Sequence, residues 1–274
     1  MIKQAIIPLA GLGTRLLPLT SVFPKELLPI NGKPGLMYIL DECIEAGIKE
    51  FIFIISDKKK SIKNYFYNDD FYKRILKKKK NDKRLIFEYS KIKKYKKMIK
   101  FVYQNSPKGT GDAVLKCKDL IKDKYFLMLL PDDLIIKKNC SKEMIRLHKR
   151  IKGSVIATKT VKMNTVSRWG ILSYKNKSKD FFKITDVIEK PKIKSSPSNF
   201  AIIGRYILPK NIMSEIKKLK PGTGGEIHIT DAIRNLIYKN EKFYGNIFKG
   251  KYLDCGTLKG FINSGIEMSK TNKL

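Results

Sequence analysis

Apolar and polar positions alternate in blocks along the first part of the chain. Residues 3–10 and 51–56 form apolar runs, which are typical of strands buried on both faces of a parallel sheet. Between them, residues 34–46 carry apolar side chains at helical spacing, with a proline at the start and a glycine just after the end. The pattern therefore predicts a β–α–β unit.

The same two periodicities continue along the rest of the chain. Strands are predicted at 100–104, 125–130, 154–160, 170–174, 182–188, 200–207 and 243–248, and helices at 141–151, 211–219, 230–239 and 257–269. Because strands and helices alternate early in the chain, we expect an α/β fold with a mostly parallel sheet that carries helices on both faces.

A lysine-rich stretch at residues 58–97 interrupts this pattern. Its aromatic and aliphatic side chains are spaced for amphipathic helices, so we expect a helical excursion over the sheet edge. The four consecutive lysines at 77–80 are expected to form an exposed turn. No linker rich in Gly, Pro or Ser divides the chain, which predicts a single domain over residues 1–274.

The net charge raises the question of a nucleic-acid partner. Lysine and arginine total 58 against 25 acidic residues, a formal charge of +33. Such an excess suits binding to phosphate backbones. However, only eight of the basic residues are arginine, and the lysines are scattered over every predicted surface. We therefore expect no nucleic-acid partner, and a solvated surface that attracts phosphorylated substrates.

Neither a leader segment nor a membrane span is predicted. The first residues lead directly into a strand, and no apolar run approaches the roughly 18 residues that a membrane helix needs. The cysteines lie far apart without a C-x-x-C pair, which argues against a zinc site or a disulfide framework. We therefore expect a soluble, cytoplasmic protein with no membrane partner.

The first motif with chemical content follows the first predicted strand. The chain reads A-G-L-G-T-R-L-L-P-L-T there, and P-K-E-L-L-P follows after three further residues. Gly11 and Gly13 have no Cβ, so backbone amides can approach a triphosphate closely, and Arg15 and Lys25 add positive charge. The spacing matches neither a Walker A loop nor G-x-G-x-x-G. Taken alone, the glycines would suit a simple tight turn equally well.

Two acidic motifs point to a metal ion. Asp132 and Asp133 directly follow an apolar strand, at the edge where an open α/β sheet binds its ligands. Carboxylate oxygens suit Mg²⁺, although a paired Asp in isolation more often caps a helix or forms a turn. A second acidic motif, Y-L-D-C-G-T, supplies Asp254.

These motifs, in this order, resemble the sugar-phosphate nucleotidyltransferases over essentially the whole chain, and within them the bacterial uridylyltransferases that act on glucose 1-phosphate. The resemblance implies a Rossmann-like three-layer α/β/α fold, with the nucleotide over the carboxyl end of the first strand. It also implies Mg²⁺-dependent transfer of UMP from UTP to glucose 1-phosphate, in a homodimer or homotetramer.

The resemblance further implies a role for individual residues. Arg15, Lys25 and Lys190 would be catalytic; Ala10, Gly11, Gly13, Thr14, Glu26, Gln104 and Gly109 would bind the nucleotide; Gly170, Glu189, Lys190 and Glu226 would bind the sugar phosphate; and Asp132 and Asp254 would bind the metal. Asp133 is expected in a turn or behind the metal ligands.

One motif departs from the uridylyl pattern. Residues 110–113 read T-G-D-A, where these uridylyltransferases more often have L-G-H-A. A thymidylyl- or cytidylyltransferase acting on a hexose 1-phosphate is therefore an alternative. The P-K-E motif, the long segment at 58–97 and the D-C-G motif all resemble the uridylyl branch. The intact basic and acidic motifs argue against an inactive relative.

Overall fold

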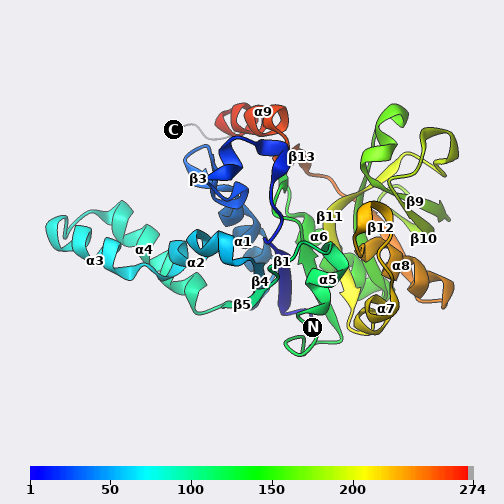
Figure 1. The fold of residues 1–274 in the computed structure, drawn as a ribbon, viewed down its shortest axis with the longest axis horizontal. Helices are drawn as coiled ribbons and strands as arrows, with labels where there is room; N and C mark the ends of the chain where they lie inside the picture. The colour runs from blue at the N-terminus through cyan, green and yellow to red at the C-terminus, as the bar shows by residue number, and fades with distance from the viewer. Residues whose placement is uncertain (271–274) are drawn as a thin grey trace.

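A nine-stranded mixed sheet forms the centre of the protein (Figure 1). The computed structural model describes residues 1–270, so the last four residues of the predicted domain lie outside it. The strands are β1 (Gln4–Pro8), β4 (Glu50–Ile55), β5 (Ile99–Tyr103), β6 (Tyr125–Leu129), β8 (Ser154–Thr160), β9 (Gly170–Lys175), β10 (Phe181–Glu189), β11 (Phe200–Pro209) and β12 (Phe243–Ile247). Each predicted strand is present, to within a residue or two at its ends.

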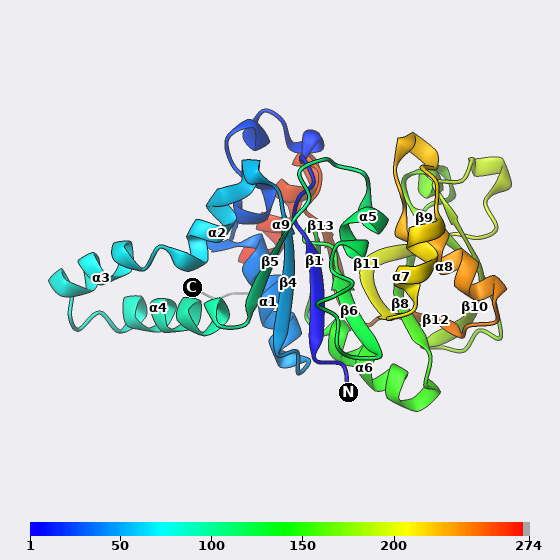
Figure 2. The ribbon, with the colours of Figure 1, turned by 60° about the horizontal axis from the view of Figure 1, so that its bottom comes forward.

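The order of the strands across the sheet is β5-β4-β1-β6-β11-β8-β12-β10-β9. The neighbours β5, β4, β1 and β6 run parallel, and so do β8 and β12. The remaining neighbours pair antiparallel. Figure 2 shows the parallel strands side by side, with β1 between β4 and β6. The sheet is thus mixed and not mostly parallel, because four neighbouring pairs run parallel and four antiparallel. Its parallel part begins with the predicted β–α–β unit.

Helices cover both faces of the sheet, as expected. Along β1, Ala5 and Ile7 pack toward α1 (Gly35–Glu45) and α6 (Cys140–Ile151), whereas Ile6 packs toward the opposite face. That opposite face is covered by α5 (Thr110–Leu115), α7 (Ile212–Lys218) and α8 (Ile229–Tyr238). Because alternate side chains point to opposite faces, a strand between two helical layers is apolar throughout. The three-layer α/β/α prediction is confirmed.

The chain between β4 and β5 leaves the body of the protein. It forms α2 (Lys60–Tyr67), α3 (Asp69–Lys78) and α4 (Lys83–Lys96), and α3 and α4 extend away from the sheet edge in both views (Figures 1 and 2). Within α3 no residue is buried. A short loop that contains Lys79 and Lys80 joins α3 to α4. We refer to residues 60–96 as the helical arm.

Several short elements are absent from the sequence prediction. Strands β7 (Asp133–Ile136) and β13 (Lys251–Asp254) form a separate antiparallel ribbon, in which Asp133 pairs with Asp254. A hairpin of β2 (Pro29–Ile30) and β3 (Lys33–Pro34) lies near α9 (Leu258–Ser269). Runs this short carry too little periodicity to be recognised. Yet the ribbon brings the two acidic motifs together.

A buried ion pair fixes the loop after β6. Arg205 on β11 is fully buried and donates to the Glu42 carboxylate of α1, with its Nη2 at 2.9 Å. The same guanidinium donates to the carbonyl oxygens of Leu130 at 3.1 Å and Asp133 at 2.6 Å. Ser141 donates to Glu42 from its amide and hydroxyl. The network thus ties β11, α1 and α6 to both ends of the Leu130–Asp133 segment.

No helix within residues 1–270 has both the length and the apolar character that crossing a membrane requires.

Neutralising Glu42 tests how much stability this network provides. In Glu42→Gln the buried Arg205 charge loses its counter-charge, and the free energy of unfolding should fall by about 3–5 kcal/mol. Glu45→Gln is the matched control on the same helix, since Glu45 is largely exposed and, within residues 1–270, pairs only with Lys142 at 3.6 Å. Its effect should stay below about 1 kcal/mol. Urea unfolding of both variants measures the difference, and equal losses would contradict the role of the network.

Candidate functional site

A cleft of about 640 Å³ opens at the carboxyl ends of β6 and β10. It brings together most residues that the motifs single out. Those that line it directly are Thr14, Arg15, Asp132, Gly170, Glu189, Lys190, Glu226 and Asp254. Ala10, Gly11, Gly13, Lys25, Glu26, Gln104 and Gly109 are not part of this lining.

The glycine loop leads from β1 into the cleft. Gly13 has φ +72°, and a Cβ there would lie 3.1 Å from the Thr20 side chain. The Thr20 hydroxyl donates to the Gly13 carbonyl at 2.9 Å, which closes the loop on itself. Around Gly11, by contrast, a Cβ would meet no atom within 4 Å. The open space beside Gly11 can therefore admit a phosphate group, whereas Gly13 is needed for the turn itself.

Asp132 is held between two cations. Its Oδ2 accepts from the Lys25 ammonium at 2.6 Å and from the Arg15 guanidinium at 3.2 Å. Burial would raise the pKa of Asp132, but Lys25 and Arg15 outweigh it and lower that pKa below its usual range. Burial would likewise lower the pKa of Lys25, and Asp132 raises it instead. Both groups are therefore charged at neutral pH, although Lys25 is nearly enclosed.

Glu26 faces the protein interior and not the cleft. It is 2 % exposed, and both of its carboxylate oxygens accept from the Lys59 ammonium, at 2.8 and 2.9 Å. Burial raises the pKa of Glu26 and lowers that of Lys59. Lys59 stands among three consecutive lysines at 58–60, and nothing in that run distinguishes it from its neighbours. Sequence reasoning therefore missed it.

The β7–β13 ribbon presents the acidic residues. Tyr252 donates its hydroxyl to Asp133 at 2.5 Å, and burial together with the nearby Asp132 charge raises the pKa of Asp133 to about 7. Asp254 accepts from the Gly256 amide at 2.9 Å. A Cβ on Gly256 would lie 2.6 Å from Asp132 Oδ2. A glycine at this position therefore lets the segment after β13 pass directly beside Asp132.

The opposite wall of the cleft is built from β9, β10 and α8. Glu189 accepts from the Thr230 hydroxyl at 3.1 Å. A Cβ on Gly170 would lie 3.2 Å from both the Glu189 carboxylate and the Thr230 methyl group, so a larger residue there would fill this wall. The Lys190 amide donates to the Trp169 carbonyl at 2.9 Å, while the Lys190 side chain is exposed.

Beside this wall stand two aromatic rings that were not assigned a role. Trp169 lies edge-on to Tyr252 at 6.1 Å between ring centroids, and both line the cleft. Trp169 is the only tryptophan in the sequence and directly precedes Gly170. Its position next to Gly170 was the only feature of the sequence that could have placed it in the site.

Gln104 and the loop before α5 form a further part of the site. The Gln104 side-chain nitrogen donates to Asp112 at 2.7 Å and to the Gly109 carbonyl at 3.2 Å. Gly109 has φ +97°, and a Cβ there would lie 2.6 Å from the Ile227 carbonyl oxygen. The Gly111 amide donates to that same oxygen at 2.7 Å. The segment that carries Glu226 is thus pinned against this loop.

Within residues 1–270 no cluster of three or more His, Cys, Asp or Glu side chains is arranged to hold a metal ion. The cleft nevertheless offers Asp132 and Asp254, which lie at the ends of adjacent segments joined by a bond from the Cys255 amide to the Asp132 carbonyl at 2.8 Å. Mg²⁺ in nucleotide sites is commonly bound by one or two carboxylates together with substrate phosphates. The donor set therefore fits an ion that arrives with a nucleotide.

Comparison with known proteins agrees with this geometry. The model of the nucleotidyl transferase family matches residues 4–270. A UTP–glucose-1-phosphate uridylyltransferase of Mycoplasma genitalium is 36% identical over 99% of this chain and 93% of its own length.

Two solved structures are similar over nearly the whole chain. A UDP-glucose pyrophosphorylase complexed with UDP-glucose superposes with a TM-score of 0.86 at 34% identity, covering 99% of this chain and 100% of that one. A UTP-bound enzyme from Acinetobacter baumannii gives 0.88 at 30% identity, over 100% and 95% of the two chains. The chain therefore belongs to the nucleotidyl transferase family, and within it to the UTP–glucose-1-phosphate uridylyltransferases.

Proposed function

We propose that this protein transfers the UMP moiety of UTP to α-D-glucose 1-phosphate and releases pyrophosphate and UDP-glucose. One observation carries the proposal: Arg15, Asp132 and Asp254 line one wall of a cleft whose other wall carries Gly170, Glu189 and Lys190. Arg15 and Lys25 both pair with Asp132. The names of the relatives and the UDP-glucose bound in one of them support the choice of substrates.

The chemistry is an in-line displacement at the α-phosphorus of UTP. A phosphate oxygen of glucose 1-phosphate forms the new P–O bond, and the bond to the β-phosphate breaks, so that pyrophosphate leaves with the electron pair. The attacking phosphate is already ionised at neutral pH, and no general base is needed. Arg15 and Lys25 stabilise the charge on the triphosphate, and Lys190 neutralises the sugar phosphate.

The nucleotide is proposed to lie over Ala10, Gly11, Gly13 and Thr14, and the sugar to lie against Gly170, with Glu189 accepting hydrogen bonds from its hydroxyls and Glu226 closing the site. Glu26 would support the nucleotide site indirectly, because its bond with Lys59 anchors the loop that carries Lys25. Asp132 and Asp254 would hold Mg²⁺, which would supply positive charge that stabilises the charge developing on the phosphates during transfer.

Gln104 is the residue proposed to read the base, together with the backbone of Gly109. Its side-chain nitrogen is occupied by Asp112 and Gly109, so its carbonyl oxygen is left as an acceptor. Such an acceptor suits the N3–H of uracil, and cytosine has no proton on N3. Thymine shares that N3–H, so a thymidylyltransferase is the remaining alternative. Asp112 is the aspartate of the T-G-D-A motif, where the uridylyl pattern more often has histidine, and it holds Gln104 in this orientation.

We further infer a single nucleotidyltransferase domain over residues 1–274 that works in the cytoplasm as a homodimer or homotetramer. All four cysteines are buried free thiols, which suits a reducing compartment. The continuous nine-stranded sheet supports one domain.

Removing the Lys25 ammonium should affect turnover far more than folding. We expect Lys25→Ala to lower kcat by about 100- to 1,000-fold, the range typical for loss of one preorganised charge-stabilising donor. Pyrophosphate release measures the rate, and urea unfolding measures stability. Lys77→Ala, an exposed lysine of the helical arm, is the control and should keep the rate unchanged. Near-normal turnover in Lys25→Ala would remove Lys25 from the mechanism.

The discrimination against CTP follows from the Gln104 acceptor, whereas the expected preference for UTP over dTTP rests on the relatives. With glucose 1-phosphate and Mg²⁺, UTP should be the best of UTP, dTTP, CTP and ATP, and CTP should be disfavoured about 100-fold or more in kcat/KM, since it cannot donate from N3. Pyrophosphate release with each nucleotide gives the ranking. A preference for dTTP would move the activity to the thymidylyl branch. No release with any of them would mean an inactive relative or a different sugar phosphate.

A further inference from the structure

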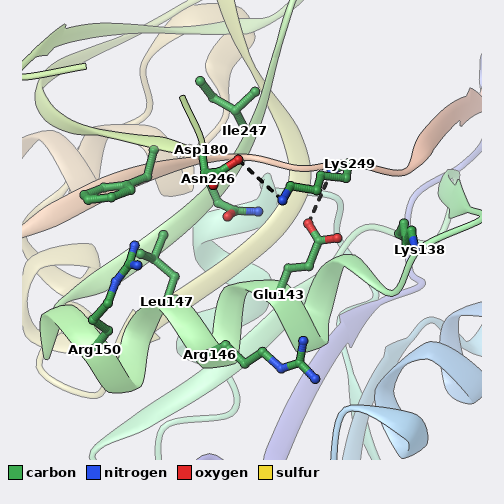
Figure 3. Close-up of a pocket in the computed structure, with 10 residues that line it drawn as sticks. Lys138, Glu143, Arg146, Leu147, Arg150, Asp180, Asn246, Ile247 and Lys249 are labelled. Atoms are coloured by element: carbon green, nitrogen blue, oxygen red, sulfur yellow. Dashed lines mark hydrogen bonds and ion pairs between the residues drawn. The ribbon is translucent and has the colours of Figure 1, made fainter. Parts of the chain in front are cut away.

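A second cleft lies apart from the catalytic one and shares no lining residue with it. It has a volume of about 540 Å³, within the range of small-molecule sites, and lies between α6 and the segment that follows β12 (Figure 3). We call it the α6–β12 cleft. Its apolar wall is formed by Leu147, Phe181 and Ile247.

Four cations surround this wall. They are Lys138, Arg146, Arg150 and Lys249. Of these four, Lys249 is the one that an acid in the described part of the chain engages: its ammonium lies 3.6 Å from Asp180, and its amide donates to Glu143 at 3.2 Å (Figure 3). Among the described residues no ion pair neutralises Lys138, Arg146 or Arg150. With Glu143 and Asp180 as the only acids in the lining, the cleft has an excess of two positive charges.

Exposed cations alone are ordinary on a protein of this charge, but two features set this cleft apart. The Arg150 guanidinium lies 4.9 Å above the Phe181 ring, which holds it at the cleft wall. Asn246 is 6 % exposed, and its side-chain nitrogen is buried without an acceptor among the described residues. Figure 3 shows this amide turned toward Lys249 and Glu143. A buried N–H without an acceptor is unfavourable, and an oxygen-rich ligand would supply one.

We propose that the α6–β12 cleft is a second ligand site that binds the phosphate group of a small phosphorylated metabolite. The phosphate oxygens accept from Arg146, Lys138 and the Asn246 amide, and the Phe181 wall covers the uncharged part of the ligand. Arginine forks and lysines are the usual partners of phosphate in proteins, and their charge-assisted bonds are the strong ones.

The position of the cleft links it to the catalytic carboxylates. Lys138 follows β7 and Lys249 precedes β13, so the two lysines stand at the base of the ribbon whose other end carries Asp133 and Asp254. A Cβ on Gly250 would lie 3.3 Å from the Lys138 carbonyl oxygen, which shows how closely the two segments pass. A phosphate held by Lys138 and the Asn246 amide therefore binds where the two segments of the ribbon come together at its base.

Calorimetric titration of the full chain, without nucleotide or magnesium, tests the site with two probes, inorganic phosphate and glucose 6-phosphate. Lys138→Gln/Arg146→Gln should weaken binding at least about tenfold, because each lost charge-assisted bond contributes on that scale. Lys80→Gln/Arg84→Gln, on the exposed arm, removes the same charge and should leave the affinity unchanged. Binding of glucose 6-phosphate alone would identify a sugar phosphate, and binding of both probes would show that the phosphate group suffices.

Three outcomes would overturn the proposal. They are no saturable binding of either probe at millimolar concentration, equal weakening in both double variants, and loss of binding in Lys190→Gln, which would place the probe in the catalytic cleft. Hydrogen exchange of the wild-type chain tests the link to the ribbon: amides in β7 and β13 should exchange more slowly with the probe bound. Unchanged exchange in β7 and β13 would exclude an effect of the bound phosphate on the ribbon. None of these readouts depends on the proposed activity.

Discussion

The buried guanidinium of Arg205 is the constraint on which the site depends. An uncompensated charge inside a protein is strongly unfavourable, so the carboxylate of Glu42 and the surrounding carbonyl oxygens must stay in place around it. Two of those carbonyls belong to Leu130 and Asp133, at either end of the segment that carries Asp132. The folded core thereby determines the backbone of the acidic loop, and the loop does not need a ligand to be shaped.

A second layer of electrostatics builds on this loop. Asp132 and Asp133 are adjacent in the chain, and burial together with the Asp132 charge disfavours ionisation of Asp133. Lys25 and Arg15 lower the pKa of Asp132, whereas the pKa of Asp133 is raised. A site that holds both cations and carboxylates suits an anionic substrate together with a divalent cation, because the basic side chains attract the anion and the carboxylates attract the cation.

The two walls of the cleft come from different parts of the sheet. The glycine loop and acidic loop follow strands of the parallel part, β1 and β6, whereas Gly170 and Glu189 belong to the antiparallel strands β9 and β10. The reacting groups of two substrates can therefore be held by separate, rigid elements on one sheet. Positioning of this kind is the main contribution that phosphoryl-type transfer requires of a protein.

The sequence alone determined the layered α/β fold, because long apolar strands and amphipathic helices follow periodicities that depend only on local geometry. It also supplied the glycine loop and both acidic motifs, since each is contiguous in the chain. Only the tertiary structure decided how they combine. The β7–β13 ribbon, the Lys59 partner of Glu26, the Asp112 partner of Gln104 and the Arg205–Glu42 pair all join residues through space. No local pattern encodes such pairs, because burial and partner choice are properties of the packed chain.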